Sequence, residues 1–348
     1  MISIIISNFN GLRFLPRLLS SLREQRSVET EIIVVDRRSQ DGSGEYLAGE
    51  KGIRVLSEPP ETGLVSGYAV GAAVATGELL FFCNEDMWFD PDCLRRLAAV
   101  IDLPARIGAA DGWHWTYDGR EWIHGATRFR KVFWQFNSPH PQRGADFFME
   151  LPAGSETPFA CAGAFLIHRD VYREVGGWDP SFFLDHEDVD LFLRAWQRGW
   201  RCVMAPEARI YHAVSAANVH ILASTGRPAA HRRYIGQRAN VSILAVKYFS
   251  WPWLLAALVQ WPLGILNNIR AGHWTYLLDD YAVPGDILRR LPAAWAFRRA
   301  NAPFNIRFPG EAFFTDPRFT AAADPSRQSA DAPLPALNPP PAPRQEPS

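Results

Sequence analysis

Short apolar runs alternate with helical patterns along the first part of the chain. Residues 2–6 are apolar except for Ser3, residues 32–35 form a second apolar run, and residues 53–56, apolar except for Arg54, form a third segment of strand length. Between the first two runs, leucines recur at helical spacing, at Leu12, Leu15, Leu18, Leu19 and Leu22. Continuous apolar runs of this kind are typical of strands that are buried on both faces. The order strand, helix, strand predicts parallel strands joined by crossover helices.

The alternation continues as far as residue 102. Small residues dominate positions 63–77, where we expect a helix, and residues 79–82 form a further apolar run. Asp90 and Pro91 are typical of an N-cap and a first helical residue, so we expect a helix from there to Asp102. The whole stretch predicts an α/β fold with a doubly wound, mostly parallel central sheet and flanking helices.

Residues 111–158 interrupt this rhythm with aromatic side chains scattered among polar ones. We interpret them as strands and loops that cover one side of the sheet. Flat aromatic faces suit sugar rings, so the segment could shape an acceptor site, and packing in the core is an equal alternative. A small-residue run before residues 165–167, followed by a helix to Val175, restores the α/β pattern.

Composition divides the chain into three parts. We expect an α/β domain at residues 1–240, with one half at 1–105 and the other at 106–240. Residues 241–318 are helical and aromatic in character and predict a separate helical extension. Residues 319–348 are rich in Pro and Ala, with almost no large apolar side chains. Such a segment cannot bury enough surface to offset its ordering entropy, so we expect a disordered tail.

Charge and cysteine content limit the function classes. The formal net charge is -1, which argues against a general affinity for nucleic acid. The four cysteines form no CxxC pair, so a zinc knuckle or a redox motif is not expected. The chain opens directly on an apolar run without a basic n-region, so no secretory signal is expected. These features favour a cytoplasmic protein.

Residues 248–269 contain no charged side chain and are flanked by basic residues. Their length could span a bilayer, but two prolines and Gln260 make a simple span less attractive. Trp-rich segments with flanking Arg and Lys bind anionic membrane surfaces. A membrane-surface unit, a packed core helix and a true span are therefore the alternatives, in this order of preference.

Polar side chains follow three of the predicted strands. Ser7 and Asn10 follow the first, Asp36 follows the second, and Asn84 and Asp86 follow the fourth. In open parallel sheets, ligands bind at the carboxyl ends of strands, so these side chains are candidates for a binding site. Two oxygen-bearing side chains at one strand end can share a Mg²⁺ or Mn²⁺ ion with a diphosphate. The alternative is that strand ends are polar simply because loops are.

The densest group of candidate catalytic residues is acidic. Four carboxylates and a histidine lie within residues 185–190, directly before an apolar helical stripe. Asp188 then falls in the first turn of a helix, whose dipole favours the ionised form, while neighbouring carboxylates raise its proton affinity. A general base needs this balance, and the alternative is an ordinary acidic helix N-terminus. A later predicted strand ends in His212. This histidine is a candidate metal ligand only if Asp86 faces it.

Four segments, at residues 4–11, 33–43, 77–86 and 176–191, carry a resemblance to a known family. In this order they resemble the inverting family 2 glycosyltransferases, in particular the bacterial rhamnosyltransferase-like members. The resemblance covers roughly residues 2–245. It implies the GT-A fold, which has a Rossmann-like, mostly parallel sheet, here followed by the C-terminal helical extension.

The resemblance implies a role for each candidate residue. The donor-binding residues would be Ser7, Asn10, Asp36 and Asn84. A divalent metal, Mg²⁺ or Mn²⁺, would be held by Asp86, Asn84 and His212. The catalytic base would be Asp188, with Glu187 beside it. The acceptor site would include Trp178 and Asp190.

The resemblance also implies a reaction and its setting. A sugar would pass with inversion from a dTDP- or UDP-linked donor to a hydroxyl of a glycan or lipid-linked acceptor, in cell-surface polysaccharide synthesis. Residues 1–105 would bind the nucleotide sugar, and residues 106–240 would carry the acceptor site and the base. No nucleic-acid partner is expected. The enzyme would be cytoplasmic, with peripheral contact at the inner face of the cell membrane as a further expectation.

Three places depart from the family pattern. Asn84 stands where Asp is usual, Arg37 stands where Asn is common, and Tyr68 and Ala69 replace two asparagines. Because of these departures, the resemblance does not decide whether the reaction depends on a metal or which nucleotide sugar is the donor. They motivate an alternative function, a degenerate protein that binds a nucleotide sugar or glycan without turnover. A nucleotidyltransferase is a third class, but residues 8–11 are neither Gly-rich nor basic enough for a triphosphate loop.

Overall fold

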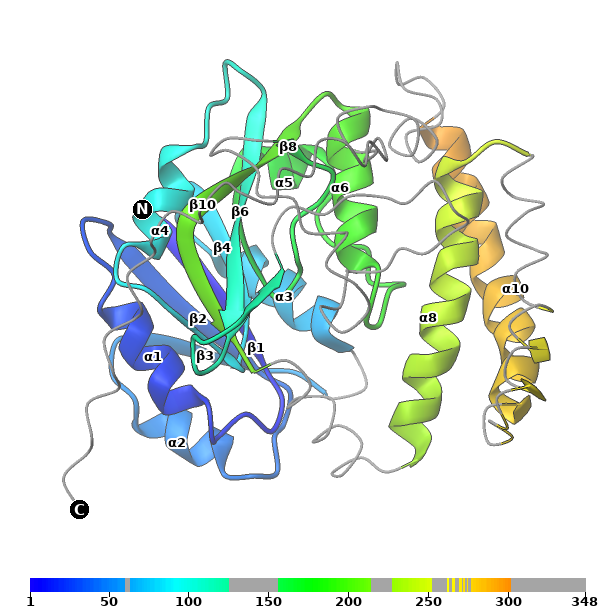
Figure 1. Cartoon of the computed structure of the whole chain (residues 1–348), viewed down its shortest axis with the longest axis horizontal. Coiled ribbons are helices and arrows are strands. Elements are labelled where there is room, and N and C mark those ends of the chain that lie inside the picture. Colours follow the sequence, from blue (N-terminus) through cyan, green and yellow to red (C-terminus); the bar gives the residue numbers. More distant parts are fainter. Residues whose placement is uncertain are drawn as a thin grey trace, which may run out of the picture.

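The computed structural model describes residues 1–59, 63–124, 156–213, 227–251 and 277–301, with a few single residues between 252 and 276. In these parts of the chain, ten strands form one mixed sheet (Figure 1). The strand order is β3-β2-β1-β4-β9-β6-β10-β5, with β7 paired to β6 and β8 paired to β10. Helices cover both faces of this sheet, which confirms the expected α/β class.

The first half of the sheet is parallel, as the apolar runs predict. Its strands are β1 (Ile2–Asn8), β2 (Thr30–Asp36), β3 (Ile53–Ser57) and β4 (Leu79–Asn84). In the register of β1, Ser7 lies opposite Asn84 on one side, and Asn8 lies opposite Asp36 on the other. The carboxyl ends of three strands therefore meet at one edge, where a ligand would bind.

The second half of the sheet is mixed. Its strands are β5 (Met87–Phe89), β6 (Ile107–Thr116), β7 (Trp122–His124), β8 (Glu156–Thr157), β9 (Ala164–His168) and β10 (Arg201–His212). Strand β9 runs antiparallel to both β4 and β6, whereas β6 and β10 are parallel. The aromatic segment that begins at residue 111 was expected to cover the sheet, but its start is β6, a strand inside the sheet. Residues 125–155 of that segment lie outside the described residues.

One face of the sheet is covered by α1 (Leu15–Arg23), α2 (Ser43–Gly49) and α4 (Cys93–Ala99). The expected N-cap of α4 is wrong, because the helix begins two residues later than predicted, with Asp92 as its N-cap. The Asp90 carboxylate instead accepts a hydrogen bond from the Tyr211 hydroxyl at 2.9 Å. The Cys93 N–H donates to the Asp90 carbonyl at 2.9 Å, which closes a turn before the helix.

The opposite face carries α3 (Gly63–Val74), α5 (Arg169–Glu174) and α6 (Glu187–Gln197). Small residues let α3 lie directly on β1, as the composition of this segment predicts. A Cβ atom at Gly67 would stand 2.4 Å from the Ser7 Oγ, and one at Gly71 would stand 2.4 Å from the Ile5 Cγ2. Larger side chains would push α3 away from the strand end that carries Ser7.

Two long helices, α8 (Arg227–Tyr248) and α10 (Leu277–Ala300), lie side by side, and α6 lies between them and the sheet (Figure 1). The expected domain boundary after residue 240 falls inside α8. Residues 302–348, which include the expected disordered tail, lie outside the described residues. In the parts of the chain that the structure describes, no helix is long and apolar enough to cross a membrane.

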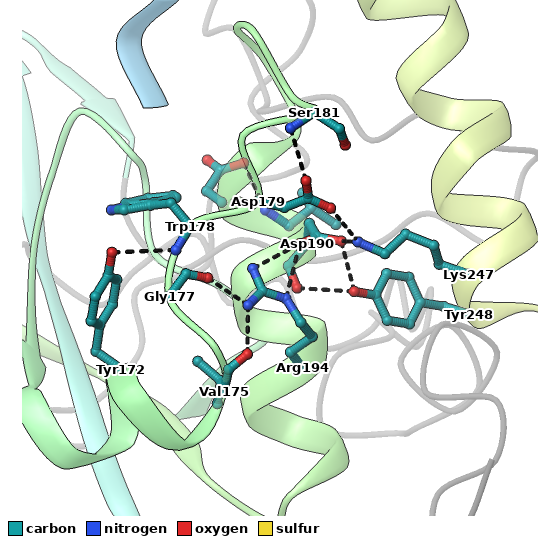
Figure 2. A network of polar contacts seen from close by, with 12 residues as sticks. Tyr172, Val175, Gly177, Trp178, Asp179, Ser181, Asp190, Arg194, Lys247 and Tyr248 are labelled. Atoms are coloured by element: carbon teal, nitrogen blue, oxygen red, sulfur yellow. Dashed lines mark hydrogen bonds and ion pairs between the residues drawn. The ribbon is translucent and has the colours of Figure 1, made fainter. Parts of the chain in front are cut away.

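A buried ion network joins α8 to α6 (Figure 2). The Asp190 carboxylate is fully buried and binds the Arg194 guanidinium through two nitrogens, at 2.9 and 2.8 Å. It also accepts hydrogen bonds from the Lys247 ammonium and, at 2.7 Å, from the Tyr248 hydroxyl. Lys247 reaches Asp179 as well, at 2.9 Å. Two cations and two carboxylates thus balance one another in this interior site, as buried charges require.

The turn between α5 and α6 is part of the same network. Gly176 and Gly177 have φ of 86° and 67°, which favour glycine, and Arg194 donates to the carbonyls of Val175 and Gly177. Burial alone would raise the pKa of Asp179, but the Lys247 ammonium and hydrogen bonds from Ser181 bring that pKa down to about 2. Asp179 is therefore ionised at neutral pH and holds the turn to α8.

Candidate active site

The predicted donor-binding residues meet at the edge formed by β1, β2 and β4. Asp36 is buried, and its Oδ1 atom accepts hydrogen bonds from the Asn8 amide at 2.7 Å and from the Ser39 hydroxyl at 2.6 Å. The Ser39 hydroxyl also accepts the Asn10 N–H at 2.8 Å. Asn8 was not among the predicted site residues. Its register opposite Asp36 is what brings it there, and the sequence pattern alone does not reveal that pairing.

Ser7 lies at the centre of this edge. It is fully buried, and its hydroxyl oxygen has no hydrogen-bond partner among the described residues. Because Gly67 approaches this oxygen closely, the space around it is small. A buried hydroxyl without a partner beside a ligand edge is consistent with a contact that forms only when a ligand is bound.

Arg37 and Glu85 form a buried pair behind the same edge. Both side chains are buried, and the Arg37 guanidinium lies 5.0 Å from the Phe9 ring centroid. Burial and the neighbouring Asp86 raise the pKa of Glu85 to about 8, and the positive charge of Arg37 opposes this rise. The unusual Arg37 therefore has an internal electrostatic role next to Glu85, which the sequence alone did not indicate.

Tyr68 and Asn84, two of the departures from the family pattern, bind each other. The Tyr68 hydroxyl donates to the Asn84 Oδ1 at 2.6 Å, a distance normal for O–H···O and short for N–H···O. Burial raises the pKa of the Tyr68 hydroxyl, so the phenol stays protonated and can donate. The Asn84 oxygen is thus engaged by the protein. This contact leaves the Asn84 amide nitrogen as the other polar atom of the side chain, and the predicted donor-binding and metal roles of Asn84 stay predictions.

Asp86 and His212 face each other, as the prediction required. The His212 Nε2 lies 3.3 Å from the Asp86 Oδ1, and the Asp86 side chain is almost fully buried while that of His212 is partly exposed. In the described parts of the chain, no group of three or more His, Cys, Asp or Glu side chains could hold a metal ion. A carboxylate and an imidazole alone still fit an ion that takes its remaining ligands from a diphosphate and water.

Asp188 lies in the first turn of α6 and is partly exposed. Its Oδ1 accepts the Val189 N–H at 2.8 Å, and its Oδ2 accepts the Ala162 N–H at 3.2 Å. Burial raises the pKa of Asp188 to about 6, which these two hydrogen bonds oppose and Asp185 reinforces. The carboxylate is therefore ionised at neutral pH but takes up a proton far more readily than an ordinary Asp, as a general base must.

A loop of small residues, Cys161 to Gly163, connects Asp188 to the edge formed by β1, β2 and β4. The Ala162 N–H binds Asp188, and the Ala162 carbonyl lies 3.1 Å from the Tyr68 hydroxyl. The Gly163 carbonyl accepts the Asn84 N–H at 2.8 Å, and a Cβ atom at Gly163 would stand 3.7 Å from the His212 ring. The sequence marked this run only as a lead-in to a strand, because its contacts are made by the backbone.

The remaining predicted residues are internal. Trp178 is buried, and its ring stacks on that of Tyr68 with centroids 5.5 Å apart. Glu187 is buried beside Asp188, and Asp190 is enclosed by the ion network. The acceptor roles of Trp178 and Asp190 stay predictions, since every contact the structure gives them is with the protein itself.

Comparison with known proteins identifies the family of this chain. The family model described as "Glycosyl transferase family 2" matches residues 3–176, which is half of the chain. This chain belongs to glycosyl transferase family 2. The family 2 enzyme is therefore a glycosyltransferase acting on nucleotide sugars, as the sequence motifs indicated. The matched region contains the donor edge and ends before Asp188.

Relatives and solved structures agree with this family. The N-acetylglucosaminyl-diphospho-decaprenol L-rhamnosyltransferase of Mycobacterium tuberculosis is 26% identical, over 72% of this chain and 84% of that protein. The N-acetylgalactosaminyltransferase 6 of Drosophila melanogaster is 30% identical over 61% of this chain, which spans only 34% of that longer protein. Residues 1–349 of TarS from S. aureus, solved with UDP, have a TM-score of 0.50, 16% identity and 90% coverage of both chains. That structure confirms the GT-A fold.

We predict that Tyr68→Phe weakens nucleotide binding by this transferase. Phe keeps the stacking on Trp178 but removes the hydroxyl that orients Asn84. The loss of one such hydrogen bond corresponds to a rise in Kd of about three- to tenfold for UDP or dTDP, measured by calorimetry. The matched control is Tyr172→Phe, which removes a buried hydroxyl of the same aromatic cluster that accepts the Trp178 N–H. Equal Kd values for wild type and Tyr68→Phe, or the same loss in the control, would contradict this role.

Proposed function

We propose that this enzyme transfers a sugar with inversion of configuration, with Asp188 as the general base. Asp188 accepts the proton of an acceptor hydroxyl, whose oxygen forms a bond to the anomeric carbon of the donor sugar. The bond from that carbon to the diphosphate oxygen breaks on the opposite face, and the nucleoside diphosphate leaves. The observation that carries the proposal is the Asp188 carboxylate, which is partly exposed and ionised with a raised pKa of about 6.

The donor edge supports a role in holding the nucleotide sugar. Asp36, Ser7 and Asn10 would contact the nucleoside, and Asn84 would donate from its amide to the ribose or diphosphate. A Mg²⁺ or Mn²⁺ ion held by Asp86 and His212 would neutralise negative charge on the departing diphosphate. Asp86 and His212 themselves face each other, and the Gly163 backbone packs beside the His212 ring. Glu187, next to Asp188, would help to position the base.

We propose a dTDP- or UDP-linked donor and a glycan or lipid-linked acceptor, in cell-surface polysaccharide synthesis. The similarity to a mycobacterial rhamnosyltransferase whose name includes a decaprenol-linked acceptor supports this direction. Exposed aromatic and aliphatic side chains between residues 251 and 288 support a peripheral contact with the inner face of the membrane. They are Trp251, Leu266, Ile269, Trp274, Tyr281 and Leu288.

The base assignment predicts the effect of Asp188→Asn. Since a positioned base contributes about 10²–10⁴-fold, kcat should fall at least about 100-fold while the Kd for nucleotide is unchanged. For the unmodified enzyme, kcat/KM should fall as the pH drops through about 6, because protonated Asp188 cannot accept a proton. The control is Asp170→Asn, an exposed carboxylate in the first turn of α5, which should keep full activity. A near-normal kcat in Asp188→Asn would remove Asp188 from this role.

The metal assignment predicts that nucleotide binding depends on Asp86. Mn²⁺ should tighten UDP or dTDP binding to the unmodified protein, measured by calorimetry, and excess EDTA should abolish both this gain and turnover. Asp86→Ala should lose the gain from Mn²⁺ while keeping the weaker metal-free binding, because Asp36 and Ser7 remain in place. Full activity in excess EDTA would show that Asp86 and His212 hold no catalytic metal.

The membrane proposal predicts co-sedimentation with vesicles that contain anionic phospholipid. Tyr281 and Leu288 are separated by close to two helical turns and so lie on one face of α10. Changing both to Ser should reduce the bound fraction, because interfacial binding scales with the apolar area inserted. Val55→Ser is the control, since Val55 is an exposed apolar residue on β3, outside the C-terminal helices. If the unmodified protein stays in the supernatant, the membrane contact is wrong.

A further inference from the structure

The turn directly before α6 has an unusual backbone. Asp185 and His186 are consecutive non-glycine residues, and both have φ of 67° in the left-handed region. Such a pair is unfavourable on its own and persists only where surrounding contacts hold it. His186 is the N-cap of α6, and Asp188 follows in the first turn. The direction of the Asp188 carboxylate therefore depends on what fixes this turn.

Helix α8 holds the turn through Asn240. This side chain is almost fully buried, and its amide nitrogen donates to the Leu184 carbonyl at 3.2 Å and to the Asp185 carbonyl at 2.6 Å. Its Oδ1 atom accepts the Arg290 Nη1 of α10 at 2.8 Å, which orients the amide so that both N–H groups face the turn. One asparagine amide thus donates a hydrogen bond to each of two adjacent carbonyls of the strained backbone.

A second residue of α8 acts on the same turn. The Gln237 amide donates to the Asp185 Oδ2 at 2.8 Å, so the side chain of Asp185 is held as well as its carbonyl. Arg290, in turn, is fixed by Asp286 at 3.1 Å within α10. These contacts form a chain that links α10 to α8 and α8 to the turn, which precedes Asp188 in the sequence.

The docking of α8 on α6 does not require these contacts. Lys247 and Tyr248, two turns further along α8, already bind the Asp190 carboxylate in the buried ion network (Figure 2). If Asn240 served only to attach the helix, its amide could face any polar group of the interface. The amide instead donates to the carbonyls of Leu184 and Asp185, at the start of the left-handed turn.

We propose that the C-terminal helices are part of the catalytic machinery, with Asn240 as the positioning residue for the base Asp188 and Gln237 in support. This inference rests on the proposed role of Asp188. Asn240 touches neither donor nor acceptor. It keeps the turn at Asp185 and His186 in the conformation that directs the Asp188 carboxylate toward the acceptor hydroxyl.

The test compares Asn240→Ala with Asn301→Ala. Asn301 is a buried asparagine of the same interface. Its Oδ1 accepts a hydrogen bond from Arg198 at the other end of α6, far along the helix from the base. Both variants remove an interface asparagine, and both are expected to lower Tm. Only Asn240→Ala should lower kcat, by about tenfold or more, because small misplacement of a catalytic group is costly. Its KM for the donor should stay within about twofold of the unmodified value.

Asn240→Asp keeps the test informative if Asn240→Ala does not fold. Asp has the same shape and retains an oxygen for Arg290, but it replaces the two N–H donors by a second oxygen that faces carbonyls. The same loss of kcat at unchanged donor KM is expected, and Gln237→Ala should give a smaller loss of the same kind. The inference would be overturned if Asn240→Ala and Asn301→Ala, at a similar loss of Tm, had equal kcat values. An active Asp188→Asn would instead overturn the proposed base, so the two failures can be told apart.

Discussion

The ion network around the buried Asp190 carboxylate is the interaction on which the position of α6 and of Asp188 depends. It joins Arg194 of its own helix to Lys247 and Tyr248 of α8, and Arg194 carries the connection on to the glycine turn after α5. Removing water from these charges costs free energy, which is offset only if each cation lies at hydrogen-bonding distance from a carboxylate. Helix α6 therefore has one position relative to the sheet and to α8. The accessible Asp188, two residues away on the same helix, takes its place from that arrangement.

The site is held together largely by backbone groups and small side chains. Ala162 offers its N–H to Asp188 and its carbonyl to Tyr68, and Gly163 offers its carbonyl to the Asn84 N–H. Gly67 brings α3 against Ser7 on the other side of the edge. Backbone atoms cannot rotate away as side chains can, so this loop holds Asp188 at a fixed distance from the edge formed by β1, β2 and β4. This is the preorganisation that transfer between two bound substrates needs.

The parts of the fold that the sequence predicted are those encoded by local pattern. Mainly apolar runs located β1 to β4 and the leucine stripe located α1, whereas the roles given to Asp36, Asp86 and Asp188 stay predictions. The order of the later strands was not predictable in this way, because the pairing of β9 with β4 and of β6 with β9 has no local signal in the sequence. Asn8, Ala162 and Asn240 were missed for a related reason. Their roles come from register and backbone geometry, and an asparagine in a helix has no distinctive pattern.

The departures from the family pattern are better understood in pairs than singly. As an isolated change, Asn84 weakens a metal site, and Tyr68 in a small-residue helix is too large. In the structure the phenol fills the space beside Trp178 and engages the Asn84 oxygen, so each residue explains the other. Arg37 likewise lies near Glu85, and its positive charge opposes the rise in the Glu85 pKa that burial and Asp86 cause. In both pairs the unusual residue lies against a group that it can bind or balance in charge, so the two members of a pair should be energetically coupled.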